Sequence, residues 1–251
     1  TIGVIMGSNV GTTLTAWILS LTGIESESVL LNLLKPENFS PLFALAGILL
    51  IMGSKRQRRR DIGRILIGFA ILMSGMEMMK NSVSPLADLP GFSDLLTAFH
   101  NPLLGVLVGA VFTGVIQSSA ASVGILQALS MTGQVPYGAA VPIIMGQNIG
   151  TCITALLSAI GAGKNAKRAA FVHLTFNLMG SGLLLTVFVL AKALLPLEGL
   201  GAPATGFGIA VVHTVFNLLC VSILLPMAGL LERLSRFVIR DEAAEETAEL
   251  D

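Results

Sequence analysis

The feature that most constrains this chain is the segment from Asn101 to Gly163, which contains no Asp, Glu, Lys, Arg or His. A charge-free segment of this length is typical of a membrane-embedded region. Only 12% of all residues are charged, whereas soluble domains average about 25%. The segment nevertheless carries Ser, Thr, Asn and Gln side chains, which lipid contact disfavours. The sequence therefore predicts an all-α polytopic membrane protein in which these polar side chains face protein, water or a ligand.

Two polar clusters lie within the charge-free segment. The first interrupts the apolar residues 102–131 with Gln117-Ser118-Ser119-Ala120. Polar residues at the centre of such a run favour a re-entrant helical hairpin, which turns inside the membrane, over one straight span. The second cluster lies within 136–160, where Gly and Pro residues permit a broken helix, and it reads Gly146-Gln147-Asn148-Ile149-Gly150-Thr151.

An internal duplication links the second cluster to the start of the chain. Residues 6–17 and 145–156 are identical at seven of twelve positions, at a constant offset of 139, which indicates a structural repeat. The same offset places the partner of the first cluster upstream of Thr1. We therefore expect this chain to be truncated at its N-terminus, and its acidic end suggests a linker to a further domain at the C-terminus.

The distribution of Lys and Arg predicts how the repeats are oriented. These residues concentrate in 55–64, 164–168 and 233–240, and the positive-inside rule assigns those loops and the C-terminus to the cytoplasm. The two copies of the repeat then cross the membrane in opposite directions. Inverted repeats with broken helices are the architecture of secondary transporters, whose binding sites lie near the membrane midplane between the repeats.

Hydropathy and charge divide the chain into four segments. A linker over 21–40 separates the first repeat motif from an antiparallel helix pair, 41–53 and 62–79, joined by a basic turn. The segments are the end of the first inverted repeat with this helix pair (1–80), an extracytoplasmic loop (81–101), the second inverted repeat with two long C-terminal helices over 169–195 and 205–231 (102–231), and an acidic cytoplasmic tail or linker (232–251).

Several polar or small residues have a structural interpretation that we favour over a functional one. Gly105 and Gly109 form a GxxxG pair, which favours close helix packing. Glu77 and Lys80 are three residues apart on one helix, so a local ion pair is favoured over a transport role. Cys152 and Cys220 lie in apolar runs without metal-ligand spacing, and we interpret them as small core residues.

Two helices carry a His and an Asn four residues apart, so that both side chains share one helical face. The pairs are His173 with Asn177 and His213 with Asn217. Hydrogen bonding between helices is the favoured interpretation, and contact with a transport pathway is the alternative. Neither His has a carboxylate nearby in sequence, and no paired carboxylates, activated nucleophile or metal spacing appears, so the sequence does not predict an enzyme. The zero net charge also argues against a nucleic-acid partner.

The chemistry of the two clusters suits small ions. Half-helix N-termini direct N–H groups at an anion, whereas freed carbonyls, hydroxyls and amide oxygens suit a hard cation such as Na+. No Lys or Arg lies near the clusters in sequence, and an uncompensated anion at the midplane would cost several kcal/mol. A cation that binds with the anion would supply the missing charge, although a neutral solute or a bare cation would also fit this chemistry.

The clusters together with the His-x-x-Phe-Asn helices resemble the sodium-dependent phosphate cotransporter family, which comprises the type II Na+/Pi cotransporters and their bacterial relatives. The resemblance covers nearly the whole chain. It implies import of inorganic phosphate with Na+ as the coupling ion, no other cofactor, and a site between two inverted Gln-Ser-Ser hairpins. The motif implies phosphate contacts at Gln117, Ser118, Ser119 and Ala120, a sodium site at Gln147, Asn148, Thr151 and Thr154, and first-repeat counterparts at Asn9, Thr12 and Thr13.

The chain departs from the family pattern in three respects. Ala120 replaces the last Ser of the hairpin motif, the repeats differ at Gln147 against Ser8 and at Cys152 against Thr13, and the first Gln-Ser-Ser hairpin lies outside the chain. The resemblance also implies a multi-pass protein of the inner (cytoplasmic) membrane, in contact with lipid, with a PhoU-like domain after the tail. The alternatives are a Na+-coupled symporter of another small anion and a membrane regulatory subunit without transport activity.

Overall fold

The computed structural model describes residues 2–23, 36–85 and 101–240. Apart from one isolated bridge between Pro136 and Pro203, the regular structure of these residues is entirely helical. Five stretches are long and apolar enough to cross a membrane, which confirms an all-α polytopic membrane fold. These stretches are Ile2–Ser20, Gln57–Ser82, Tyr137–Ser158, Lys164–Leu194 and Gly206–Val238.

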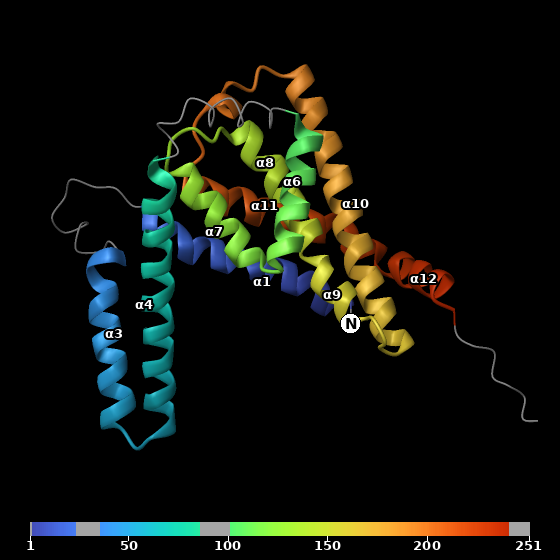
Figure 1. The fold of residues 1–251 in the computed structure, drawn as a ribbon. Helices are drawn as coiled ribbons and strands as arrows, with labels where there is room; N and C mark the ends of the chain where they lie inside the picture. The colour runs from blue at the N-terminus through green and yellow to red at the C-terminus, as the bar shows by residue number, and fades with distance from the viewer. Residues whose placement is uncertain (1, 24–35, 86–100, 241–251) are drawn as a thin grey trace, which may run out of the picture.

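The helices of the described residues are arranged as Figure 1 shows, with α3 and α4 standing beside the remaining helices. In chain order they are α1 (Ile2–Ser20), η1 (Leu21–Gly23), α3 (Pro36–Gly53), α4 (Gln57–Val83), α6 (Pro102–Ile116), α7 (Ser119–Ser130), α8 (Tyr137–Gly150), α9 (Cys152–Ser158), α10 (Lys164–Leu194), η3 (Glu198–Gly201), α11 (Gly206–Leu224), η4 (Leu225–Met227) and α12 (Ala228–Val238).

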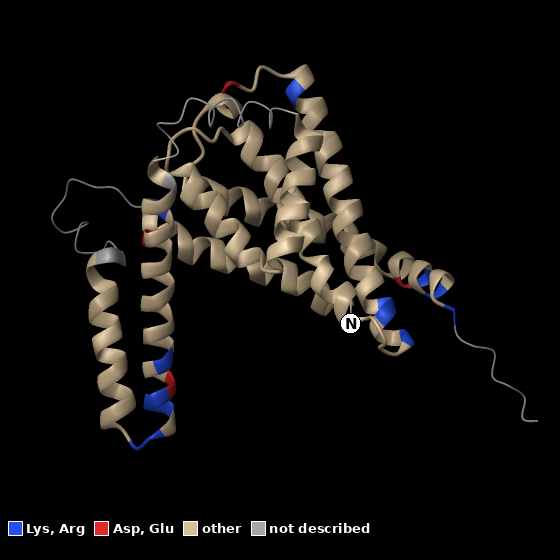
Figure 2. Ribbon diagram, viewed as in Figure 1, with Lys and Arg blue, Asp and Glu red and all other residues tan. Residues whose placement is uncertain are grey.

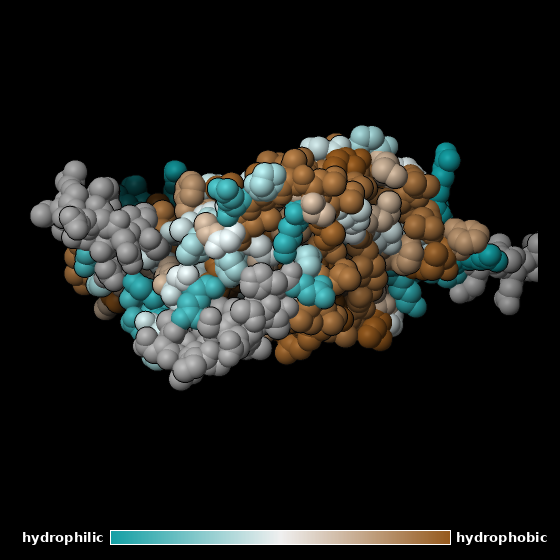
Figure 3. Space-filling view, turned by 90° about the horizontal axis from the view of Figure 1, so that it is seen from above, coloured by the Kyte–Doolittle hydropathy of each residue, from teal (hydrophilic) through white to brown (hydrophobic). Residues whose placement is uncertain are grey.

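Large apolar side chains cover much of the described surface. Ile65 of α4 is 70% exposed and Val115 of α6 is 75% exposed, and the hydrophobic residues form a broad area in the space-filling view (Figure 3). Exposed apolar area of this extent would be unfavourable in water. It is the surface expected of helices that contact lipid.

The predicted antiparallel pair forms, but its helices are longer than expected. α3 begins at Pro36 rather than residue 41, so the proline at the expected start, Pro41, lies inside the helix. α4 begins at Gln57, inside the expected basic turn. The backbones touch where a Cβ on Gly47 would lie 2.7 Å from the carbonyl oxygen of Gly63, and the reverse contact has the same distance.

The expected ion pair at the far end of α4 is confirmed, with 3.9 Å between Lys80 Nζ and Glu77 Oε1. α4 continues to Val83, so the expected loop after residue 80 begins later than predicted. Residues 86–100 of that loop, 24–35 of the linker and 241–251 of the acidic tail lie outside the described residues.

The apolar run over 102–131 forms a helical hairpin, as predicted. Its arms α6 and α7 have 15 and 12 residues, so they rise only about 22 and 18 Å, less than the roughly 30 Å of a bilayer core. The arms meet at Gln117 and Ser118, where helical geometry is lost. A hairpin of these dimensions would reach partway through a membrane and return.

The predicted close packing at the GxxxG pair is confirmed, and two glycines of α8 take part in the same contact between α6 and α8. A Cβ added to Gly109 of α6 would collide with the carbonyl oxygen of Ile143, and one added to Gly146 of α8 would collide with that of Val106. A Cβ on Gly150 would lie 2.5 Å from the carbonyl oxygen of Ala110, and one on Gly105 would lie 3.0 Å from Cβ of Pro142. The hairpin is therefore fixed to α8 by direct backbone contact.

The second cluster differs from a full helix break. Thr151 separates α8 from α9, yet its φ and ψ of −60° and −24° remain helical, so the span continues almost directly. The first-repeat copy of the motif lies within the uninterrupted helix α1. Among these three stretches, the chain reverses direction only at the Gln-Ser-Ser cluster.

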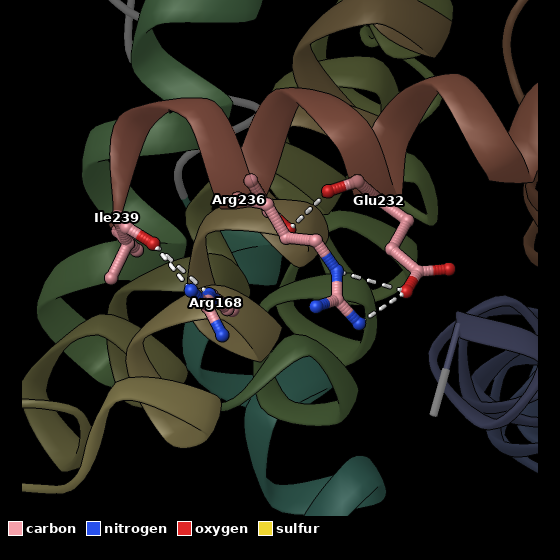
Figure 4. Close-up of polar contacts among 5 residues, drawn as sticks. Arg168, Glu232, Arg236 and Ile239 are labelled. Atoms are coloured by element: carbon pink, nitrogen blue, oxygen red, sulfur yellow. Dashed lines mark hydrogen bonds and ion pairs between the residues drawn. The ribbon is translucent and has the colours of Figure 1, made fainter. Parts of the chain in front are cut away.

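The last predicted helix, over 205–231, is divided in two. α11 ends at Leu224, and Pro226 lies in the short 3-10 turn that precedes α12, because proline lacks the N–H that an α-helix needs. Arg168 of α10 then donates two hydrogen bonds, of 3.0 and 2.8 Å, to the carbonyl oxygen of Ile239 (Figure 4). This contact closes the C-terminal end of α12 against the start of α10.

Candidate functional site

The turn of the hairpin has a left-handed residue at its centre. Gln117 adopts φ 59° and ψ 22°, and it is the one described non-glycine residue with a positive φ. Its N–H donates to the carbonyl oxygen of Thr113 at 2.7 Å, which closes the end of α6. Left-handed backbone is unfavourable for residues with a Cβ, so this conformation is imposed by the surrounding structure and marks a candidate functional position.

Ser118 and Ser119 begin the second arm of the hairpin. Ser118 is the N-cap of α7, and its Oγ accepts a hydrogen bond of 3.2 Å from the N–H of Ala121. The first N–H groups of a helix have no partner within the helix, so those of Ser119 and Ala120 are directed out of α7. Within the described residues, the Ser119 hydroxyl also has no hydrogen-bond partner. Both residues are partly exposed.

Two hydrogen bonds to Ser122 connect the second arm of the hairpin to α6 and to α8. Thr113 of α6 donates from Oγ1 to Oγ of Ser122 on α7 at 2.7 Å, and Gln147 of α8 donates from Nε2 to the carbonyl oxygen of Ser122 at 3.0 Å. All three residues are buried. Gln147 Oε1 is also buried and lacks a donor within the described residues. The structure therefore brings one of the expected sodium residues directly against the hairpin that is expected to bind phosphate.

The other expected sodium residues bond mainly within their own helices. Asn148 donates from Nδ2 to the carbonyl oxygen of Ile144 at 2.9 Å. Thr151 donates to the carbonyl oxygen of Asn148 at 2.6 Å, and Thr154 to that of Thr151 at 3.0 Å. A hydroxyl that donates to a backbone carbonyl keeps its lone pairs, so both threonines retain oxygen acceptors that a cation can use.

The first-repeat counterparts lie on α1 and are used differently. Asn9 is buried and donates from Nδ2 to Oδ1 of Asn177 on α10 at 3.2 Å. Thr12 and Thr13 donate to carbonyl oxygens of their own helix, at 3.0 and 2.7 Å. Asn177 also donates to Sγ of Cys152 at 3.3 Å. Asn177 thus joins the first-repeat motif to Cys152, which follows the second motif.

The predicted interhelical role of the His and Asn pairs is confirmed for Asn177 alone. Asn217 donates from Nδ2 to the carbonyl oxygen of His213, within its own helix, at 2.9 Å. His213 is buried, and its Nδ1 has no partner in the described part of the chain. The interpretation of Cys152 and Cys220 as core residues is confirmed, since both are free and buried.

Sequence reasoning assigned no role to three residues that the structure shows to be buried and hydrogen-bonded, namely Thr113, Ser122 and Gln127. Thr113 and Ser122 each lie a few residues from the Gln-Ser-Ser cluster, and the nine-residue spacing that joins them has meaning only once a hairpin is assumed. Gln127 is fully buried on α7. A Gln inside an apolar run was a usable signal, because such a side chain must find polar partners in protein.

The arrangement has donors for an anion on α7 and an acceptor for a cation on α8, which contacts α7. The donors are the N–H groups at the start of α7 and the Ser119 hydroxyl. The acceptor is Gln147 Oε1, which is buried on α8. Gly146 and Gly150 of the second motif pack against α6, and α1, which carries the first-repeat motif, contacts α7. Such a site suits an oxyanion together with a monovalent cation.

Comparison with known proteins agrees with this chemistry. The family model described as Na+/Pi-cotransporter matches residues 1–81 and 86–214. YqeW of Bacillus subtilis, an uncharacterized protein, is 30% identical over 240 residues, which is 95% of this chain and 73% of YqeW. YjbB of Salmonella typhimurium, whose name proposes the export of inorganic phosphate, is 29% identical over 95% of this chain and 41% of its own length.

A shorter match reaches a human protein. Sodium-dependent phosphate transport protein 2B of Homo sapiens is 40% identical over 95 residues, which is 36% of this chain and 14% of that protein. No solved structure matches the chain significantly. The chain spans less than half the length of YjbB. The family model describes a class of transporters rather than enzymes. Because this model matches most of the chain, the chain belongs to the Na+/Pi-cotransporter family.

Proposed function

We propose that this chain is part of a secondary active transporter that moves inorganic phosphate across the membrane together with Na+. Family membership supports phosphate as the substrate and Na+ as the coupling ion. The observation that carries the site is the left-handed turn at Gln117, after which α7 begins with N–H groups that have no partner within the helix. Phosphate binds there through Gln117, Ser118, Ser119 and the N–H of Ala120.

The coupling cation binds beside the hairpin. Na+ prefers oxygen ligands. Four residues supply them here: Gln147 through Oε1, Thr151 and Thr154 through their hydroxyls, and Asn148. A buried acceptor without a donor, such as Gln147 Oε1, is costly in apolar surroundings. A bound cation offsets that cost and compensates the charge of the phosphate, because no Lys or Arg lies within the hairpin or α8.

The second half of the site comes from an inverted repeat, and the glycines support this proposal. Gly146 and Gly150 of α8 contact α6, but their counterparts Gly7 and Gly11 on α1 have nothing within 4 Å of an added Cβ. We infer that a helix equivalent to α6, carrying the first Gln-Ser-Ser motif, packs on this face in the complete transporter. Gly7→Ala should then destabilise the complete protein although it is harmless in this chain alone.

The charge distribution supports a multi-pass protein of the inner membrane with a cytoplasmic C-terminus. The Lys and Arg residues of the α3–α4 turn, the start of α10 and the end of α12 lie in the lower part of Figure 2, whereas charged residues near the far end of α10 lie at the top. The basic side is therefore cytoplasmic. A PhoU-like domain after the acidic tail belongs to the same proposal.

The decisive experiment is phosphate flux in proteoliposomes that contain the complete polypeptide. We expect uptake of radiolabelled phosphate under an inward Na+ gradient and none under an equal K+ gradient. Ser119→Ala should reduce uptake, and the hydroxyl-retaining Ser119→Thr should restore part of it. Ser118→Ala is less diagnostic, because it also removes an N-cap worth about 1 kcal/mol.

Three other outcomes would change the conclusion. Phosphate efflux driven by an outward Na+ gradient, without uptake under an inward one, would agree with the name of YjbB. The proposed direction of transport, import, would then be replaced by export. Na+-driven flux of a different anion would replace phosphate as the substrate. If correctly inserted protein carried no anion at all, the transport proposal would give way to a membrane regulatory subunit.

A further inference from the structure

The second arm of the hairpin is attached to two distant helices by one side chain. Gln127 of α7 is 0% exposed. Its Nε2 donates to the carbonyl oxygen of Ala16 on α1 at 3.0 Å and to that of Gly206 on α11 at 2.9 Å. These partners lie 111 and 79 residues away in sequence. A single amide group therefore connects three helices.

The orientation of this amide follows from its partners. Both are backbone carbonyls, which only accept hydrogen bonds, so the group between them is the NH2 and not the oxygen. Gln127 Oε1 is consequently turned away, and it has no donor within the described residues. A buried acceptor without a donor is unfavourable. Stability of the fold alone does not explain why a glutamine occupies this position.

The two carbonyls do not require Gln127. Ala16 and Gly206 belong to α-helices, in which each carbonyl also accepts from the N–H four residues later. Replacing Gln127 by an apolar side chain of similar length would leave both carbonyls satisfied and would remove the unpartnered oxygen. The contact thus ties α7 to α1 and α11 without being needed by either helix.

We propose that Gln127 is a positioning residue, which holds the phosphate-binding turn in register with α1 and α11. Ser118 and Ser119 start the same helix that carries Gln127, and Ala16 lies one helical turn after Thr13 of the first-repeat motif. The amide makes the hairpin arm and α1 move as one body. This assignment rests on the proposed function of the hairpin.

The test compares Gln127→Met with Ser130→Ala in the complete polypeptide. Met matches Gln in length but cannot donate. Ser130 is buried one turn away on the same helix, and its hydroxyl donates to the carbonyl oxygen of Gln127, at 2.7 Å. Ser130→Ala therefore removes a buried polar group at the same depth but removes no hydrogen bond between helices.

We expect Gln127→Met to keep or raise the Tm and to leave the equilibrium Kd for phosphate within about twofold. Its maximal transport rate should fall by about tenfold or more, because small misplacements of a positioned group are costly. Ser130→Ala should transport at the wild-type rate. Unchanged transport by Gln127→Met would overturn the proposal, and so would a loss of rate that merely follows a fall in Tm.

A second readout does not depend on transport. Spin labels at Val115 of α6 and Leu14 of α1, both exposed, report the distance between hairpin and α1 once the native cysteines are replaced. Gln127→Met should broaden that distance distribution, and Ser130→Ala should not. If the wild type moves no phosphate, the proposed function fails. The positioning role is then decided by the distance distribution alone, and a width in Gln127→Met that equals that of the wild type rejects it.

Discussion

Asn9 of α1 and Asn177 of α10 form a buried hydrogen bond of 3.2 Å across 168 residues of sequence. Both side chains are almost fully buried. Asn177 is held in turn by its bonds to the carbonyl oxygen of His173 and to Sγ of Cys152. A first-repeat motif residue is thereby fixed to the helix that packs beside the second motif.

The Asn9–Asn177 bond should appear as a coupling energy in a double-mutant cycle. Hydrogen bonds between helices in membranes are worth about 0.6 kcal/mol on average and up to about 1.7 kcal/mol. We expect Asn9→Ala and Asn177→Ala to be non-additive by an amount in this range, measured by unfolding in bicelles. Asn9→Ala combined with Asn217→Ala should be additive, because Asn217 bonds within its own helix.

The glycine crossing between α6 and α8 should tolerate no side chain. Gly146→Ala would place a Cβ against the carbonyl oxygen of Val106, and neither backbone can move without displacing the hairpin. We expect this substitution to lower the free energy of unfolding by several kcal/mol and to reduce the yield of membrane-inserted protein. Thermal unfolding in detergent measures the loss of stability. Gly182→Ala on α10 meets nothing within 4 Å and should stabilise its helix by up to about 1 kcal/mol. Equal behaviour of the two variants would contradict the close crossing.

The bond between Thr113 and Ser122 should stabilise the turn of the hairpin. Thr113→Val keeps the side-chain shape and removes the hydrogen bond of 2.7 Å, which should cost about 1 kcal/mol and slow phosphate transport. Hydrogen exchange of the α7 amides would detect the loosened turn. Thr186→Val removes a bond within one helix on an exposed surface, so it should alter neither measurement.

The contact of Arg168 with Ile239 should hold α12 in place. Arg168→Gln removes a charge-assisted pair of hydrogen bonds, which is stronger than a neutral pair. We expect faster hydrogen exchange across Ala228–Val238 and little change in α8. Lys167→Gln removes a neighbouring exposed charge and should leave α12 protected, and a result in which both variants expose α12 would attribute the effect to charge alone.

The two cysteines should be inert in the folded protein. Cys152 is 0% and Cys220 is 3% exposed, so a membrane-permeant maleimide should label neither until the protein is denatured. Ser158→Cys, at an exposed position of α9, should be labelled in the native state when the native cysteines are absent. Rapid native labelling of Cys152 would show that α9 separates from α10.

The sequence anticipated most of the local structure because local structure depends on local chemistry. Polar residues inside the apolar run at Gln117 required a turn, and the run was too long and too polar for one span. It anticipated the second cluster less well: Gly and Pro residues near Thr151 permitted a break, but packing of α8 along α6 keeps that span nearly continuous. The division at Pro226 was also missed, since hydropathy does not change there.

The sequence by itself determined the class of protein, the position of the hairpin and the resemblance of its motifs to phosphate transporters. The first two follow from composition, spacing and periodicity, and the third from the likeness of short motifs to those of a known family; all three are properties of residues that are neighbours in sequence. Only the tertiary structure decided that Gln147 meets the hairpin, that Asn9 bonds to Asn177 and that Gln127 joins α7 to α1 and α11. Contacts between helices depend on how each helix is rotated and where it crosses its neighbour, and periodicity does not specify either quantity.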